Sequence, residues 1–152
     1  MFVADDAFTL TMNMLKPYSK RDLSKEEKIF NYRLSRARRI IENCFGILAA
    51  KWRIYRTAIN AKVVLVEQII ESTVCLHNWL RQHKNNNYFD VQMVDTDDNG
   101  NSTPGSWRQY ENNFQLLPPY NTNCNRAAKE TRIKYTTYFN GTGAVDWQDN
   151  MI

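Results

Sequence analysis

Side chains that could do chemistry lie in two short stretches of this sequence. The first is the aspartate pair Asp5-Asp6, which follows the apolar start of the chain. Acidic residues at the carboxyl end of a strand are the usual layout of an α/β active site, although a simple turn would use the same pair. The second is Glu42, a single acid in an arginine-rich run. From spacing alone, Glu42 is either a site carboxylate or a solvated partner of Arg38 and Arg39, a pairing that contributes about 0.2–0.5 kcal/mol.

The basic residues are concentrated in the first part of the chain. The formal net charge is only +4 over 152 residues, a length that fits one domain. Lys16 to Lys62 nevertheless holds 13 Lys/Arg against 4 Asp/Glu, whereas Lys84 to the end holds 6 against 8. We therefore expect a phosphate-binding surface from the first of these segments and none from the second.

Three cysteines, Cys44, Cys75 and Cys124, are widely spaced and form no Cys-x-x-Cys pair. This pattern argues for a reducing compartment and against a disulfide framework or a zinc site. No stretch approaches the ~20 apolar residues of a membrane span, and no secretory signal is present. We expect an intracellular protein, located in the nucleus with the cytoplasm as a second compartment, and no membrane partner.

The arginine-rich run is expected to lie on one long helix, from about Ser24 to Leu48, which Trp52 could extend. Ser24 and Glu27 form a capping box at its start. Apolar or small residues recur at helical spacing and predict its buried stripe: Phe30, Leu34, Ala37, Ile41, Cys44 and Leu48. Glu42 lies just beside this stripe, and the small residues Gly46 and Ala49 on its face leave the carboxylate room.

Before and after this helix the sequence predicts shorter elements. Residues 1–10 begin as a strand, and Thr11 to Leu23 is expected to be an irregular connection because Pro17 prevents a helix there. The aromatic and basic residues from Trp52 to Arg56 alternate, either as a short strand or as an edge whose aromatics pack in the core or stack on DNA bases.

A second helix is expected from about Ala61 to His83, capped by Asn60. His77 lies on its apolar face, where a histidine is more often a hydrogen-bonded core residue than a catalytic one. The members of that face, with Thr73 an alternative to Val74, are Val63, Val66, Ile70, Val74, His77 and Leu80.

The rest of the chain, from Lys84 on, has a different composition. Lys84 to Tyr120 is rich in turn and linker residues and is expected to be mobile. Its run Asp95 to Gly100 superficially resembles a calcium loop but has no glutamate at position twelve and no flanking helices, so we reject calcium binding. A last helix is expected from about Arg126 to Phe139, ending at Asn140-Gly141.

Four stretches together resemble the later part of the nuclease domain of Harbinger/PIF-type transposases and their domesticated relatives. Ala4-Asp5-Asp6-Ala7-Phe8-Thr9-Leu10 is similar to the family's G-D-x-A-F-x-L, an alignment that selects Asp5 over Asp6. Arg38-Arg39-Ile40-Ile41-Glu42-Asn43-Cys44-Phe45-Gly46 resembles R-x-x-V-E-x-x-F-G. Cys75 to Leu80 resembles C-x-L-H-N-F/W-L, and Tyr138 to Gln148 resembles the family's C-terminus.

The resemblance implies an α/β RNase H-like nuclease of the DDE superfamily, in which two aspartates and a glutamate hold two Mg²⁺ or Mn²⁺ ions. Asp5 and Glu42 would be two of these metal ligands, and Arg36, Arg38 and Arg39 would lie near DNA phosphate. Hard cations prefer carboxylate oxygens, and a metal pair ~3.5–4 Å apart can activate water and orient a phosphodiester. The implied partners are DNA and a Myb-like DNA-binding protein.

The first aspartate of the triad would lie upstream of Met1. We therefore expect a C-terminal portion of a nuclease, mainly α with one or two short strands, that is inactive as written. Its expected parts are residues 1–83 from the nuclease domain, a flexible acidic and polar linker at 84–120, and a C-terminal helix and tail at 121–152. With few strands to cover, the helices should leave apolar surface exposed. The alternative is a non-catalytic basic helical module that binds DNA or protein.

Overall fold

The structure is a computed structural model that describes residues 1–83, 87–98, 101–110 and 124–152. It divides into two compact units, one formed by Met1–Ile40 with Leu116–Ile152 and the other by Ile41–Gln115. Among the described residues the protein is mostly helical, as predicted, but it has four short strands in two small sheets where one or two strands were expected.

The longest helix, α1 (Lys25–Lys51), begins and ends close to its expected bounds. Its capping box is formed as predicted, since the Ser24 N–H donates to Glu27 Oε2 at 3.0 Å and the Glu27 N–H donates to Ser24 Oγ at 3.3 Å. The predicted buried stripe is only partly correct. Phe30 and Leu34 are buried. Ala37, Ile41 and Cys44 are exposed, and neither core cluster includes them.

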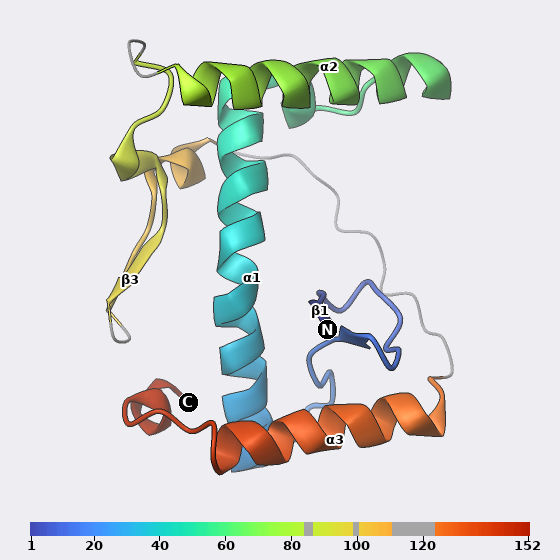
Figure 1. Ribbon diagram of the computed structural model, residues 1–152, viewed down its shortest axis with the longest axis vertical. Coiled ribbons are helices and arrows are strands. Elements are labelled where there is room, and N and C mark those ends of the chain that lie inside the picture. The colour runs from blue at the N-terminus through green and yellow to red at the C-terminus, as the bar shows by residue number, and fades with distance from the viewer. Residues whose placement is uncertain (84–86, 99–100, 111–123) are drawn as a thin grey trace. The chain divides into compact units, whose positions relative to one another are not determined.

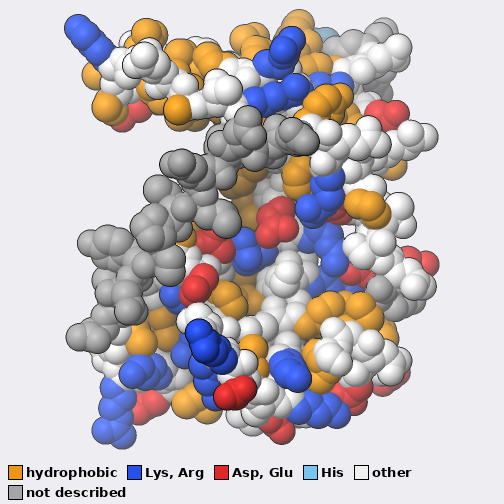
Figure 2. All heavy atoms as spheres, turned by 180° about the vertical axis from the view of Figure 1, so that it is seen from behind, with side chains coloured by type: hydrophobic (Ala, Val, Ile, Leu, Met, Phe, Trp, Pro, Cys, Tyr) orange, Lys and Arg blue, Asp and Glu red, His pale blue; other side chains and the backbone are white. Residues whose placement is uncertain are grey.

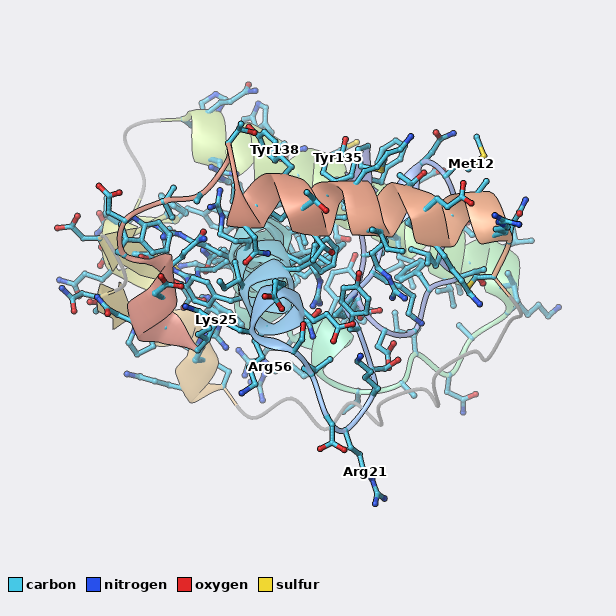
Figure 3. The ribbon with its side chains drawn as sticks, turned by 90° about the horizontal axis from the view of Figure 1, so that it is seen from below. Met12, Arg21, Lys25, Arg56, Tyr135 and Tyr138 are labelled. Atoms are coloured by element: carbon cyan, nitrogen blue, oxygen red, sulfur yellow. The ribbon has the colours of Figure 1, made fainter. Side chains whose placement is uncertain are left out.

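The first unit contains a short parallel pair of strands, β1 (Phe2–Val3) and β2 (Met14–Leu15), in the register Phe2 to Met14. The second strand lies inside the segment expected to be irregular. The helix α3 (Arg126–Asn140) crosses beneath the start of α1, as Figures 1 and 3 show, and the short 3₁₀ helix η4 (Gln148–Met151) follows it.

This unit has a core of three buried side chains, Leu15, Phe30 and Leu34. Partly buried aromatics pack against it, and two of them come from α3: Tyr18, Tyr135 and Phe139. The prediction for the last helix is confirmed, because the Asn125 side chain caps its start and Gly141 follows its end.

The second unit contains the end of α1 and several shorter elements. They are the 3₁₀ helix η1 (Arg53–Arg56), the helix α2 (Val63–Gln82), the 3₁₀ helix η2 (Val91–Met93), the antiparallel strands β3 (Thr96–Asp98) and β4 (Asn101–Thr103), and the 3₁₀ helix η3 (Ser106–Gln109). Its core cluster joins Ile47, Met93 and Trp107.

Three expectations for this unit need correction. The 3₁₀ helix η1 replaces the alternative of a strand near Trp52. The helix α2 starts two residues later than expected, with Lys62 rather than Asn60 at its N-cap and no side-chain cap. Short elements occupy the described residues of the segment expected to be loose, because Met93 and Trp107 are apolar anchors for it. The predicted division into domains stays a prediction.

In the part of the chain that the structure describes, no helix combines the length and apolar character needed to cross a membrane.

Candidate functional site

Asp5 lies just after β1, where the chain turns away from the strand. Its Oδ1 accepts a hydrogen bond of 2.9 Å from the Ala7 N–H, and its Oδ2 lies 3.8 Å from Arg38 Nη2. The Asp5 side chain is 45% exposed. The first unit thus brings together two of the predicted site residues, Asp5 and Arg38, and leaves the carboxylate accessible to solvent.

Asp6 has a different environment from its neighbour. Lys16 Nζ lies 2.9 Å from Asp6 Oδ1 and also donates to the Asp6 carbonyl oxygen at 2.9 Å. One lysine therefore binds the backbone and the side chain of the same residue, and Asp6 ties the turn after β1 to the residue that follows β2. This tie gives Asp6 a structural role that Asp5 does not share.

Glu42 lies on α1 and is partly exposed. In its own unit the Glu42 charge acts on Arg108. The pKa of the Arg108 guanidinium is raised, first by its hydrogen bonds to Asp95, then by the Asp95 charge, with a smaller contribution from the Glu42 charge. The residue after Glu42, Asn43, is buried. The helix turn that carries Glu42 is therefore held in place through the buried side chain of Asn43.

Asn43 is held by a group of hydrogen-bonded residues that are buried except for Arg108. We call it the Asn43–Asp95 cluster: Asn43, Asp95, Gly105, Trp107 and Arg108. Asn43 Oδ1 accepts from the Asp95 N–H at 2.9 Å and from Trp107 Nε1 at 2.9 Å, while Asn43 Nδ2 donates to the Asp95 carbonyl at 3.2 Å. The Asp95 carboxylate accepts from the Gly105 N–H at 2.7 Å and from Arg108 Nε at 2.9 Å. One side chain of α1 thus bonds to the residue before β3 and to a residue of η3, which follows β4.

The glycine of the arginine-rich motif serves this packing. A Cβ on Gly46 would lie 2.2 Å from Cε3 of Trp107. The space expected beside the Glu42 carboxylate is therefore occupied at Gly46 by an indole ring, which corrects the sequence-based reading of that glycine. Gly105 is equally confined, since a Cβ there would lie 2.2 Å from the Met93 carbonyl oxygen.

The arginines of α1 are partly buried and engage the protein itself. Arg33 donates to the Gly143 carbonyl and to Gln148 Oε1, both at 3.0 Å. The Arg36 guanidinium lies 3.9 Å from the ring centroid of Trp147. These contacts attach the C-terminal residues to α1. Arg39 is also partly buried and has interactions within the protein.

His77 has the structural role that the sequence predicts. It is buried on α2, and its Nδ1 lies 2.7 Å from the hydroxyl of Tyr88. Trp52 Nε1 donates to that hydroxyl at 2.8 Å, so Tyr88 joins the indole of Trp52 to the imidazole of His77. Burial lowers the pKa of His77, and the positive charges of Arg81 and Lys51 add to this effect.

The sequence did not reveal the Asn43–Asp95 cluster or the place of Tyr88. Asn43 is adjacent to Glu42, and Asp95 lies in a run whose composition is typical of turns, so neither carries a local signal of burial. The only available hint was Trp107, a large apolar residue in an otherwise polar segment.

Asp5 belongs to the first unit and Glu42 to the second, so each is a candidate ligand within its own unit. Within residues 1–83, 87–98, 101–110 and 124–152, no group of three or more His, Cys, Asp or Glu side chains is placed to hold a metal ion. The carboxylates have the right donor chemistry for a hard cation, but these residues alone do not make a complete metal site.

A family model matches residues 1–78, and its description is DDE superfamily endonuclease. The match covers more than half of the chain and includes Asp5, the arginines of α1 and Glu42. Neither the curated proteins nor the solved structures include one that matches this chain.

Proposed function

Since the chain belongs to the DDE superfamily endonucleases, we propose that it belongs to a transposase-derived DNA endonuclease of the Harbinger/PIF type that depends on divalent metal ions. The nuclease would have an RNase H-like fold. The observation that carries the proposal is the extent of the family match, which includes both candidate carboxylates and the arginines between them.

Asp5 and Glu42 are the residues that would contribute to binding Mg²⁺ or Mn²⁺. Asp5 is the better candidate of the aspartate pair because its ion pair is looser: Lys16 lies 2.9 Å from the Asp6 carboxylate, whereas Arg38 lies 3.8 Å from that of Asp5, and the two side chains are similarly exposed. Arg38 would have to share Asp5 with a cation, since its guanidinium lies 3.8 Å away. We assign no catalytic step to these residues, because the described residues do not complete a metal site.

DNA is the proposed partner of the basic face of α1, with Arg36, Arg38 and Arg39 as its contacts. Each of the three is partly exposed, which lets a guanidinium keep its internal contact and still present N–H groups to a phosphate. A nuclear location and a Myb-like DNA-binding partner belong to the same proposal.

A second candidate function is a non-catalytic basic helical module that binds DNA or protein. The observation in its favour is that the described residues offer no group of three metal-binding side chains. The two functions differ in one measurable property. The nuclease proposal requires that Asp5 and Glu42 bind a divalent cation, whereas the binding module requires only the arginines.

The experiment is a Mn²⁺ titration of the full chain, followed by electron paramagnetic resonance of the free ion. We expect weak, millimolar binding that falls at least severalfold in Asp5→Asn and in Glu42→Gln. Asp6→Asn is the matched control, since it neutralises the adjacent acid and should leave the affinity unchanged. Equal affinities in all four proteins would reject the metal-ligand assignment and favour the binding module.

A further inference from the structure

The apolar surface of α2 is much wider than the part that the protein buries. Only Thr73 and His77 of this helix are buried. Seven of its large apolar side chains remain exposed, by 37% to 73%: Val63, Val64, Leu65, Ile70, Val74, Leu76 and Trp79. Figure 2 shows hydrophobic side chains along much of this helix. A helix that is apolar on several sides is normally covered on several sides.

One strip of this exposed surface has a symmetric arrangement of charge. Glu67, Val74 and Arg81 are spaced seven residues apart, so they lie on one line along the helix. Val63 and Ile70 lie on the same strip, within roughly 40° of Val74 at 100° per residue. The strip therefore has an acid toward one end, a base toward the other and an apolar centre.

The two charges have no opposite partner on their own helix face. The residues three and four positions from Glu67 are Val63, Val64, Ile70 and Glu71. Glu71 has the same charge as Glu67, which is unfavourable at this spacing. Arg81 is exposed, and its guanidinium carbon lies 5.0 Å from the centroid of the Phe89 ring. This contact uses the guanidinium charge and not its N–H groups, which can still donate to a carboxylate.

We propose that this strip is the contact surface between two copies of the chain, which pair through antiparallel α2 helices. A twofold axis beside Val74 places Val74 against Val74 of the second copy and Glu67 against Arg81 of the second copy. The same operation repeats the Glu67–Arg81 pair on the other side of the axis, as a self-complementary interface requires. The charge order selects the antiparallel arrangement, because parallel helices would place like charges together.

The opposite flank of α2, formed by Leu65, Leu76 and Trp79, is also exposed but has no such arrangement of charges. Leu76 is two residues from Val74 and therefore points roughly 200° away from it. It provides a control position on the same helix turn, with a similar exposure of 48%.

The first test is charge reversal, with the mass of the full chain measured by sedimentation over a concentration series. Glu67→Arg and Arg81→Glu should each raise the dimer Kd by about tenfold or more, because each makes two like-charge contacts in the twofold pair. The double variant should restore the wild-type Kd. Both positions are exposed, and far-UV circular dichroism confirms that the variants fold. A monomer at all concentrations, or a double variant no better than the single ones, would overturn the proposal.

The second test locates the axis. In a background with all three cysteines changed to serine, Val74→Cys should form a disulfide-linked dimer on oxidation with diamide, and Leu76→Cys should not. Preferential cross-linking at Leu76→Cys would overturn the proposal and place the contact on the opposite flank.

Discussion

Gly46 of α1 lies directly against the indole of Trp107, so close that a Cβ on the glycine would be 2.2 Å from Cε3 of the ring. The same indole donates to Asn43 Oδ1, three residues earlier on the helix, at 2.9 Å. One helix turn thus supplies both the space and the hydrogen-bond acceptor for a single side chain. Glu42 directly precedes Asn43 on the helix, so the hydrogen bond from the ring to Asn43 also fixes the backbone that carries Glu42.

Gly46→Ala should destabilise the second unit. The added methyl group overlaps the face of a buried ring that Asn43 holds in place, and overpacking of this kind costs about 1–3 kcal/mol. The free energy of unfolding from urea denaturation measures the effect. Gly141→Ala is the comparison and should cost less, because its Cβ would make one tight contact, 3.2 Å from the Thr137 carbonyl oxygen, instead of overlapping a ring. Equal stability of the two variants would show that Trp107 does not pack on Gly46.

Asp95→Ala should be more costly than the loss of an exposed ion pair. Asp95 is buried, and its removal leaves the Gly105 N–H without an acceptor and Arg108 without its carboxylate. We expect a loss of about 2–4 kcal/mol in the free energy of unfolding. This is less than the loss expected for a fully buried ion pair, because the Arg108 side chain is 45% exposed. Asp98→Ala, which removes an exposed acid of β3, is the control. A loss below about 1 kcal/mol for Asp95→Ala would contradict the cluster.

Stability should fall as the pH is lowered through about 6.5, and His77 should account for part of the fall. Its pKa is lowered in the folded state, chiefly by burial, from an ordinary value of 6.5. The unfolded chain therefore binds the proton first, which costs stability below that pH and none above it. One proton gives a slope of at most about 1.4 kcal/mol per pH unit.

Urea denaturation at several pH values between 7.5 and 5.5 tests this expectation. His77→Gln should flatten the slope, because it removes the buried imidazole whose pKa the fold lowers. The physical event is the appearance of a positive charge on a buried ring that also faces the charges of Arg81 and Lys51. An unchanged slope in His77→Gln would place the titrating group elsewhere.

The helices were predictable because their signals are local. The capping box of Ser24 and Glu27 and the end of α3 at Gly141 involve residues at most three positions apart. The face that α1 buries was not predictable beyond Leu34, since Ile41 and Cys44 have the same spacing as buried residues and yet are exposed. Periodicity identifies an apolar face but does not say which partner covers it.

The environment of the candidate site depended on distant partners. Asn43 binds Asp95, which is 52 residues further along the chain, and no period relates the two. Asp95 also lies in a run that favours turns by composition, and its burial follows only from the acceptors and donors that surround it. Asp5 and Glu42 could therefore be predicted as candidate site residues from the sequence, but the residues that surround them could not.

The basic face of α1 should bind DNA without sequence preference and with a steep dependence on salt. Arg39→Ala should lower the slope of log K against log[salt] by about one if Arg39 neutralises one phosphate. Fluorescence anisotropy with a labelled duplex across a salt series measures the slope. Lys129→Ala removes an exposed charge from α3 and should leave the slope as it is. The reverse result would move the DNA contact from α1 to α3.

The polypeptide of residues 1–152 should not cut DNA by itself. Asp5 and Glu42 are two carboxylates, whereas the metal pair of the proposed nuclease would call for three, and the described residues contain no group of three or more metal-binding side chains. Mg²⁺ dehydrates reluctantly and needs carboxylates as well as substrate phosphates to stay in place. Loss of one ligand also loosens the geometry, and a misplacement of ~1 Å can cost ~100-fold in rate.

Plasmid nicking in Mg²⁺ and in Mn²⁺ measures this activity, with the wild-type chain and Glu42→Gln compared at equal concentration. We expect both proteins to match the background of a mock purification. Nicking by the wild type that disappears in Glu42→Gln would contradict the expectation, because it would mean that Glu42 acts in a complete site and that a further acid of this chain supplies the third ligand. Nicking that persists in Glu42→Gln would instead identify a contaminating nuclease, since this substitution removes a required carboxylate and keeps the shape of the side chain.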